Sequence, residues 1–331
     1  MSKFKLPSWL PQVLGYCVSI VCLIWVLHGY NFREFSADVR DLDWKWVALG
    51  VGADLAVYFA HAWRWNTLLN PVVRLRFWRT VQSIFIGLFA NEVLPLRTGE
   101  LIRCYLLSHW SNLRLSLSFS SAAVERLIDG YWMMGTFLVT AAFVKSIPRD
   151  ILILVQLLGI LLLAGAGLLV WVVVHKQQVH LVVAESRWAA VLRHIVEGLH
   201  LMGGLRTIGI TSLISLLYLA LQVLSYYALM KAYRFDLSFW VAGAVLTIVR
   251  LGTVVPNAPG NIGLTQVACV VALRLFDVEP NVAKTFSFFL NIATVVPLLI
   301  GGAVATALTG LKIGELRDRA QRGAATVQTD A

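Results

Sequence analysis

Charged and polar residues interrupt apolar parts of this sequence at three places where their spacing could support chemistry. The first runs Asn91-Glu-Val-Leu-Pro-Leu-Arg-Thr-Gly-Glu-Leu-Ile-Arg103. Pro95 would end one helix there, and Gly99 would let two backbones approach closely. Thr98 would cap the next helix, whose N-terminus attracts anions. Arg97 would add a planar guanidinium suited to phosphate.

The same segment also supplies carboxylates. Glu92 and Glu100 can pair with Arg97 or Arg103 when no ligand is bound. Charge placed inside a membrane is costly, which favours a functional role over a structural one. The alternative is a structural ion cluster that only holds two helices together.

The second place runs Val255-Pro-Asn-Ala-Pro-Gly-Asn-Ile-Gly-Leu-Thr-Gln266. Its prolines and glycines indicate an unwound turn, with Gly260 at its centre. The neutral side chains of Asn257, Asn261 and Gln266 could donate hydrogen bonds to a ligand there. A tight turn that only packs against the first segment is an equally good interpretation.

The third place is Glu125-Arg-Leu-Ile-Asp129. Glu125 and Asp129 share a helix face, and Arg126 is spaced to pair with Asp129. A carboxylate here could pair with Arg97 or carry a coupling proton. A static charge-balancing network is the alternative.

One more helical face carries ionisable groups. Asp54, Tyr58, His61 and Trp65 fall on one side of the segment 44–65. Asp54 and His61, together with Glu92, are candidates for proton coupling. Polar groups that line a vestibule or bond to a neighbouring helix are the alternative. The cysteines and histidines do not cluster as metal ligands, and we expect no metal and no cofactor.

Composition sets the environment for these groups. Of 331 residues, 58% are hydrophobic and 14% charged, whereas soluble domains are about 25% charged. The mean hydropathy of +0.74 is too high for one soluble core. Apolar runs predict an all-α polytopic membrane protein, because each is long enough to cross a hydrocarbon core of about 30 Å. The six predicted spans are 10–30, 44–65, 116–144, 150–175, 207–230 and 282–311.

Two further apolar regions, 77–110 and 238–276, are broken by the polar segments described above. Irregular backbone at membrane depth is tolerated only inside protein or beside a cavity. Each region is therefore predicted to be a re-entrant hairpin of two short helices. Residues 1–331 would form one membrane domain in which 1–144 and 150–311 are inverted repeats, a common transporter design.

Charge counting predicts the orientation. Sixteen Lys and Arg, with Arg64 and Arg103 counted among them, fall in segments on the side of the N-terminus, against nine on the other side. The positive-inside rule places both termini in the cytoplasm of a cell (inner) membrane protein. The loop 176–206 and the tail 312–331 would then be cytoplasmic, with the loop on anionic phospholipid. The net charge of +10 needs no nucleic acid to explain it.

The three segments together resemble a known family. The chain is similar to the lysylphosphatidylglycerol synthase transmembrane-region family, or flippase-like domain, which includes the UPF0104-type membrane proteins. The resemblance implies movement of lipids or lipid-linked glycans between leaflets. It does not imply aminoacylation, because the soluble transferase domain is missing. Gln266 stands where the family often has an acidic residue. The carrying motifs are Asn91 with Leu94-Pro-x-Arg97-x-Gly99-Glu100-x-x-Arg103, Glu125-Arg126-Leu-x-Asp129, and Pro256-x-x-Pro259-Gly260-x-x-Gly263.

The sequence therefore predicts a transporter or flippase, not an enzyme, for a lipid with a phosphate-bearing head group, such as a phospholipid or a polyprenyl-phosphate-linked glycan. Three alternatives stay open: a transporter of small anionic solutes, a membrane-embedded enzyme acting on a lipid phosphate, and a partner subunit of an envelope-lipid synthase. The predicted head-group residues are Asn91, Arg97, Thr98, Gly99, Glu100, Arg103, Glu125, Arg126, Asp129, Asn257, Gly260, Asn261 and Gln266.

Overall fold

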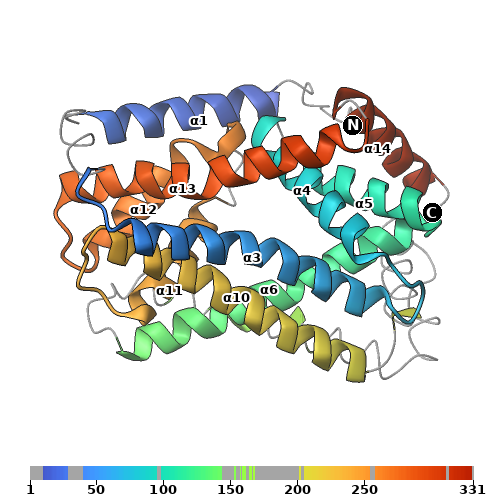
Figure 1. Ribbon diagram of the computed structural model, residues 1–331, viewed down its shortest axis with the longest axis horizontal. Helices are drawn as coiled ribbons and strands as arrows, with labels where there is room; N and C mark the ends of the chain where they lie inside the picture. The colour runs from blue at the N-terminus through green and yellow to red at the C-terminus, as the bar shows by residue number, and fades with distance from the viewer. Residues whose placement is uncertain are drawn as a thin grey trace, which may run out of the picture.

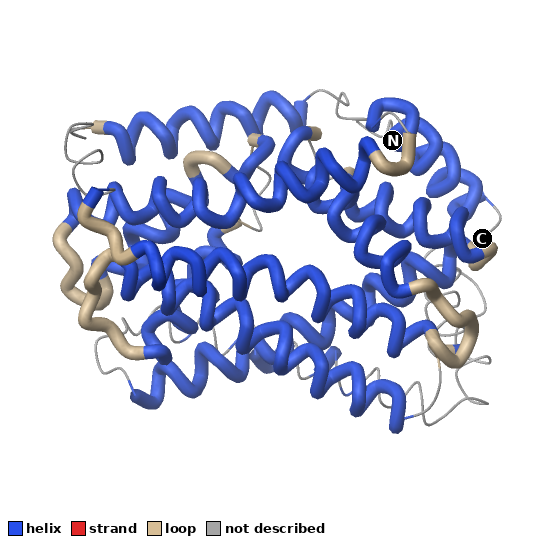
Figure 2. The backbone as a smooth tube through the Cα atoms, in the orientation of Figure 1, coloured by secondary structure: helices blue, strands red, loops and turns tan. Residues whose placement is uncertain are grey.

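A computed structural model describes residues 10–28, 40–94, 98–143, 153, 157, 159–161, 164–165, 167, 201–202, 205–253, 258–310 and 313–329. Throughout these residues the regular structure is helical, which confirms the all-α prediction (Figure 2). The elements, labelled in Figure 1, are α1 (Leu10–Leu27), α3 (Trp44–Leu69), α4 (Phe77–Val93), α5 (Gly99–Ser111), α6 (Leu115–Phe143), α10 (Leu205–Ala232), α11 (Phe239–Gly252), a 3-10 turn η2 (Pro259–Asn261), α12 (Leu264–Arg274), α13 (Pro280–Ala307) and α14 (Ile313–Thr329).

The long helices fall where the apolar runs predict them. Among the described residues, α10 and α13 are both long and apolar enough to cross a bilayer. Helices α3 and α6, of 26 and 29 residues, have the length as well but carry ionisable side chains. The predicted span 150–175 and the loop 176–206 lie almost wholly outside the described residues.

Side-chain caps fix where several helices begin. The carboxylate of Asp43 accepts a hydrogen bond from the backbone N–H of Lys45 at the start of α3. Ser238 does the same for Val241 in α11. At the start of α13, Glu279 caps the chain just before a proline, which is tolerated in the first helical turn.

The region 77–110 forms two short helices, α4 and α5, that pack against each other. They lie so close that a Cβ atom on Gly99 would overlap the carbonyl oxygen of Gly87. The predicted capping role of Thr98 is wrong, because its side chain makes no cap hydrogen bond. The Asn91 side chain instead accepts from the Gly99 N–H at 2.8 Å, and so ties the end of α4 to the start of α5.

The region 238–276 forms a second pair of short helices, α11 and α12, and the packing of the two pairs corresponds. Helix α3 contacts α10 along its length, with Gly50 beside Leu229 and Arg64 beside Ser215, so the two run antiparallel. Helix α13 packs on α4, as α6 packs on α11. Likewise α5 packs on α6, and α12 on α13.

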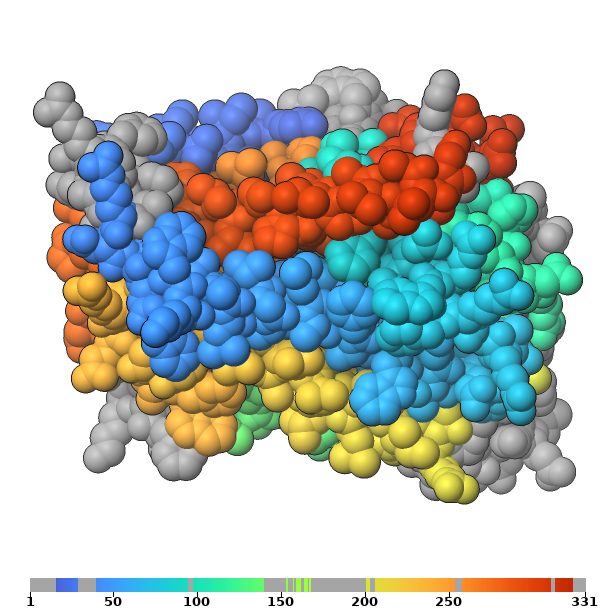
Figure 3. Space-filling model, in the orientation of Figure 1, coloured from blue at the N-terminus to red at the C-terminus, as the bar shows by residue number. Residues whose placement is uncertain are grey.

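Side chains fill the space between the ribbons. The gap that separates α3 from α13 in Figure 1 is closed in the space-filling view of the same face (Figure 3). Buried residues form two apolar clusters, one mainly on α3 to α6 and one mainly on α10 to α13. Each helix pair is thus anchored in its own half of the bundle.

The segment 313–329, which the sequence analysis treats only as part of a tail, is a helix. Its buried residues Leu316 and Ala320 are four apart, so they share one face and join the apolar cluster of α5 and α6. A single short amphipathic helix gives a weak apolar signal, which is why hydropathy alone does not reveal it.

Gly99 to Ala should destabilise the protein by about 1–3 kcal/mol, because overpacking forces α4 and α5 apart. Thermal unfolding of the detergent-purified protein measures this. Gly52 to Ala is the matched control, since a Cβ atom there meets nothing within 4 Å. Equal melting temperatures for the two variants would contradict the close approach.

Candidate functional site

Glu125 of α6 is the centre of a buried ion network and is itself fully buried. One carboxylate oxygen accepts from Arg64 Nε at 3.0 Å. The other lies 3.2 Å from Arg103 Nη1 and 3.3 Å from His61 Nε2. Both arginine side chains are buried too, with 0% and 1% of their surface exposed. Helices α3, α5 and α6 therefore meet on one carboxylate.

Two more carboxylates complete the network. Arg64 also binds Asp129, with Nη2 3.3 Å from Oδ2. Glu100 lies between two arginines, at 2.7 Å from Arg103 Nε and 2.6 Å from Arg126 Nη2. The Arg126 and Glu100 side chains are 50% and 35% exposed. The network thus has a buried centre and an exposed edge.

The charges in this network balance. Among the described residues, three arginines face three carboxylates, so their charges sum to zero when His61 is neutral. Buried charges are tolerated only when paired and hydrogen-bonded in this way. An added anion would need one carboxylate to release its arginine. The arrangement is therefore suited to exchange between an internal carboxylate and an external anion.

Aromatic rings hold the two buried guanidinium groups. Arg64 lies 4.7 Å from the ring centre of Tyr218, and Arg103 lies 4.5 Å from that of Trp65. Such cation–π contacts are worth most where water is excluded. Trp65 is held in turn by its N–H, which donates to Ser121 at 2.8 Å.

Arg103 keeps one free donor. Its Nη2 is buried and has no hydrogen-bond partner within the described part of the chain. Thr98 Oγ1, at the start of the same helix α5, is also buried and has no hydrogen-bond partner among the described residues. Unsatisfied buried donors are rare and need an explanation, and a ligand acceptor is one that fits a site.

The structure brings together most of the predicted site residues of the first and third segments and one from span 44–65. Glu100, Arg103, Arg126 and Asp129 all join Glu125 in one network, together with His61. Arg97 and Asn257 lie outside the described residues.

Arg64 is not among the predicted site residues. The prediction that Arg64 and Arg103 are flanking charges on the cytoplasmic side is wrong, because both side chains are buried. Arg64 follows His61 by three residues and so lies on the same helical face. This three-residue spacing, within a helix that continues to Leu69, was the sequence feature that could have identified Arg64 as a site residue.

Asp54 and His61 do not form a joint relay. Asp54 accepts from Tyr58 at 3.0 Å and interacts electrostatically with Arg250 of α11. His61 belongs instead to the Glu125 network, and no hydrogen bond between described residues joins the two. Glu92, near the end of α4, reaches the turn of the second helix pair. One of its carboxylate oxygens approaches Gly260 there.

The second turn is held by its own backbone. Gly260 and Gly263 have φ angles of 75° and 93°, which favour glycine, and Asn261 has φ of 52°. The buried side chain of Gln266 accepts from the Gly263 N–H at 2.7 Å. Its amide therefore caps α12, whereas we expected it to bind the head group.

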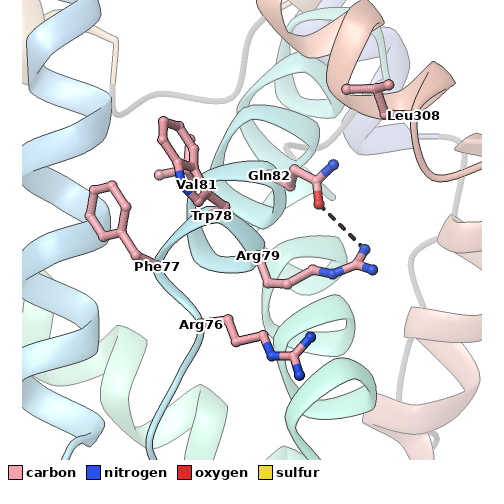
Figure 4. A pocket seen from close by; sticks show the side chains of 7 residues that line it. All are labelled: Arg76, Phe77, Trp78, Arg79, Val81, Gln82 and Leu308. Atoms are coloured by element: carbon pink, nitrogen blue, oxygen red, sulfur yellow. Dashed lines mark hydrogen bonds between the residues drawn. The ribbon is translucent and has the colours of Figure 1, made fainter.

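A hollow of about 600 Å³ lies away from the network, at the start of α4 (Figure 4). None of the predicted site residues lines it. Arg79 there lies 5.1 Å from the ring centre of Trp110 and contacts Gln82. The lining residues are Arg76, Phe77, Trp78, Arg79, Val81, Gln82 and Leu308.

Comparison with known proteins decides the family. The family model described as the lysylphosphatidylglycerol synthase TM region matches residues 12–302. The chain belongs to this family. It is therefore a membrane protein, and the family description suggests a lipid-related role.

Curated relatives are distant but cover most of the chain. A UPF0104 membrane protein of Methanothermobacter thermautotrophicus is 21% identical over 82% of this chain and 86% of its own length. A second UPF0104 membrane protein, from Methanocaldococcus jannaschii, is 21% identical over 66% of this chain and 92% of its own length. No solved structure matches.

Glu125 to Gln should destabilise the protein strongly, by about 3–5 kcal/mol, because it leaves Arg64 and Arg103 buried without their shared charge. Thermal unfolding in detergent measures the loss. Glu315 to Gln, on the exposed face of α14, is the matched control. A melting temperature no lower than that of the control would show that the network does not stabilise the fold.

Proposed function

We propose that this protein moves a lipid with an anionic, phosphate-bearing head group from one leaflet to the other. The observation that carries the proposal is the balanced ion network, which has a buried centre and an exposed edge at Glu100 and Arg126. Buried ionisable groups in membrane proteins commonly mark a transport pathway. The family's link to membrane lipid supports a lipid as the cargo.

In this mechanism the phosphate enters by ion-pair exchange. It takes the place of Glu100 on Arg103 or Arg126, whose geometry suits phosphate as well as carboxylate. The free Nη2 of Arg103 and the N-terminus of α5 add donors. Arg97, two residues before α5, would add another charge. The acyl or prenyl tails stay in lipid throughout.

The repeat and the re-entrant hairpins are part of the proposal. In the proposed repeat, α3, α4, α5 and α6 correspond in order to α10, α11, α12 and α13. Each main contact among these eight helices then has a counterpart, as α4 with α5 corresponds to α11 with α12. The antiparallel pair α3 and α10 supports an inverted relation between the halves. Alternating access by motion of one half against the other then follows from the symmetry.

The charged ends of the bundle support the proposed orientation, with both termini in the cytoplasm. The end where α3 begins and α10 ends has basic residues that nearby carboxylates largely offset. They are Arg40, Lys45, Lys231, Arg234, Arg274 and Lys284, with Asp41, Asp43, Asp236, Asp277 and Glu279. The end with the α3–α4 loop is more basic, which is typical of the cytoplasmic side. It carries Arg74, Arg76, Arg79, Arg114, Arg206, Arg317, Arg319 and Arg322, with Glu315 and Asp318 as the described acidic residues.

Labelling of reporter cysteines tests this orientation. In a variant whose four native cysteines are serine, Val72 to Cys should react with a membrane-impermeant maleimide only after the membrane is opened. Asp236 to Cys should react in intact cells or spheroplasts. Labelling of both positions from the same face would contradict the topology.

A reconstituted flipping assay tests the function. Wild-type protein in liposomes should move fluorescent phosphatidylglycerol between leaflets, and Arg97 to Ala should reduce the rate at least tenfold, because a charged donor to phosphate is lost. Arg274 to Ala, on the exposed face of α12, should not. No movement by the wild type would reject the flippase. Chemical turnover of a lipid phosphate in detergent would identify an enzyme instead.

A further inference from the structure

Arg250, on the last turn of α11, is a basic residue of the second helix pair that lies beside α10. Its side chain is exposed, unlike those of Arg64 and Arg103. Among the described residues it has no ion pair, since no carboxylate oxygen lies within 4.0 Å of its guanidinium nitrogens. One hydrogen bond is formed, from Nη2 to Gln222 Oε1 at 3.4 Å, and it is long.

The surroundings of Arg250 come from α3 and α10. Asp54 and Tyr58 on α3, and Tyr218 and Tyr226 on α10, lie within electrostatic range of its guanidinium. Asp54 already accepts from Tyr58 at 3.0 Å. The guanidinium therefore keeps free donors while tyrosine hydroxyls and the Gln222 amide lie around it. Such a set can bind the oxygens of a phosphate.

Arg250 lies at one end of a polar seam between α3 and α10. The spacing of three and four residues puts each set on one helical face. Tyr218 connects the two ends of this seam. It lies near Arg250 at one end, and its ring lies under Arg64 at the other. Its ring centre is also 5.6 Å from that of His61. The seam is formed by Asp54, Tyr58, His61 and Arg64 of α3, and by Gln222, Tyr218, Ser215 and Thr211 of α10.

Unpartnered polar atoms on α10 mark the same helix face. Thr211 Oγ1 and Ser225 Oγ are buried and have no hydrogen-bond partner among the residues that the structure describes. Thr211 is four residues before Ser215, and Ser225 is three after Gln222, so both extend the seam. Polar groups are costly to bury without partners, and a passing head group would supply them.

We propose that Arg250, with Gln222, Tyr218 and Tyr226, forms a second anion site that binds the phosphate of the transported lipid. This inference rests on the proposed function and deepens it. The site would receive the phosphate along the seam from the Glu125 network. That network is charge-balanced, whereas no described carboxylate lies at ion-pair distance from Arg250. Asp54 partly offsets the Arg250 charge when the site is empty.

Binding of a soluble lipid probe tests this site. Dihexanoyl-phosphatidylglycerol, below its micelle concentration, should bind the purified full chain more tightly than the uncharged dihexanoylglycerol, as measured by calorimetry. Arg250 to Gln should weaken binding about tenfold or more, and Arg250 to Lys less, because lysine keeps the charge but not the planar fork. Arg274 to Gln, the control, should bind as the wild type does. Equal binding by wild type and Arg250 to Gln would overturn the site.

A second measurement uses the wild type, so it does not depend on whether the Arg250→Gln variant folds. Phenylglyoxal modifies arginine, and the probe should protect Arg250 of the wild type from it, as read by peptide mass spectrometry. No protection would overturn the site. Protection by inorganic phosphate alone would support an anion site that recognises the free ion as well as the head group.

The two proposals fail separately. Binding that depends on Arg250, without lipid movement in liposomes, would support the site and reject the flippase. Lipid movement that is unchanged in Arg250 to Gln would support the flippase and overturn the site.

Discussion

The pairing of the Glu125 carboxylate with Arg64 and Arg103 is the interaction on which the rest of the structure depends. It joins α3, α5 and α6 at a point from which water is largely excluded. An isolated charge at such a depth would cost several kcal/mol, so each helix is fixed by the others' charges. The close approach of α4 and α5 at Gly87 and Gly99 is what carries Arg103 to this point.

The same balance that stabilises the network restrains its chemistry. A site whose charges already cancel can bind an anion only by exchange, so the exposed edge at Glu100 and Arg126 is where exchange costs least. The second helix pair differs in this respect. Within the described part of the chain, no carboxylate lies at ion-pair distance from Arg250, so the two helix pairs differ in their electrostatics. Under the proposed function, the two sites would therefore differ in their affinity for a phosphate.

Sequence patterns predicted the helices and two of the three polar segments well, because apolar run length and helical spacing are local properties. The pairing of Glu100 with Arg103 was anticipated, but Glu125 was expected to pair with Arg97 and instead binds Arg64 and Arg103. The role of Arg64 was not anticipated, because it depends on which face of α3 meets α6, a property of packing. Thr98 and Gln266 show the same limit, since backbone geometry decided which side chains became caps.

Native mass spectrometry of the lipids that stay bound to the purified protein tests the central claim most directly, with wild type beside Arg126 to Ala. Arg126 lies at the exposed edge, so its loss should leave the fold intact. We expect the wild type to retain a phosphate-bearing lipid above its abundance in the membrane, and the variant not to. Retention of bulk lipid alone, equally by both proteins, would contradict a head-group site in this network.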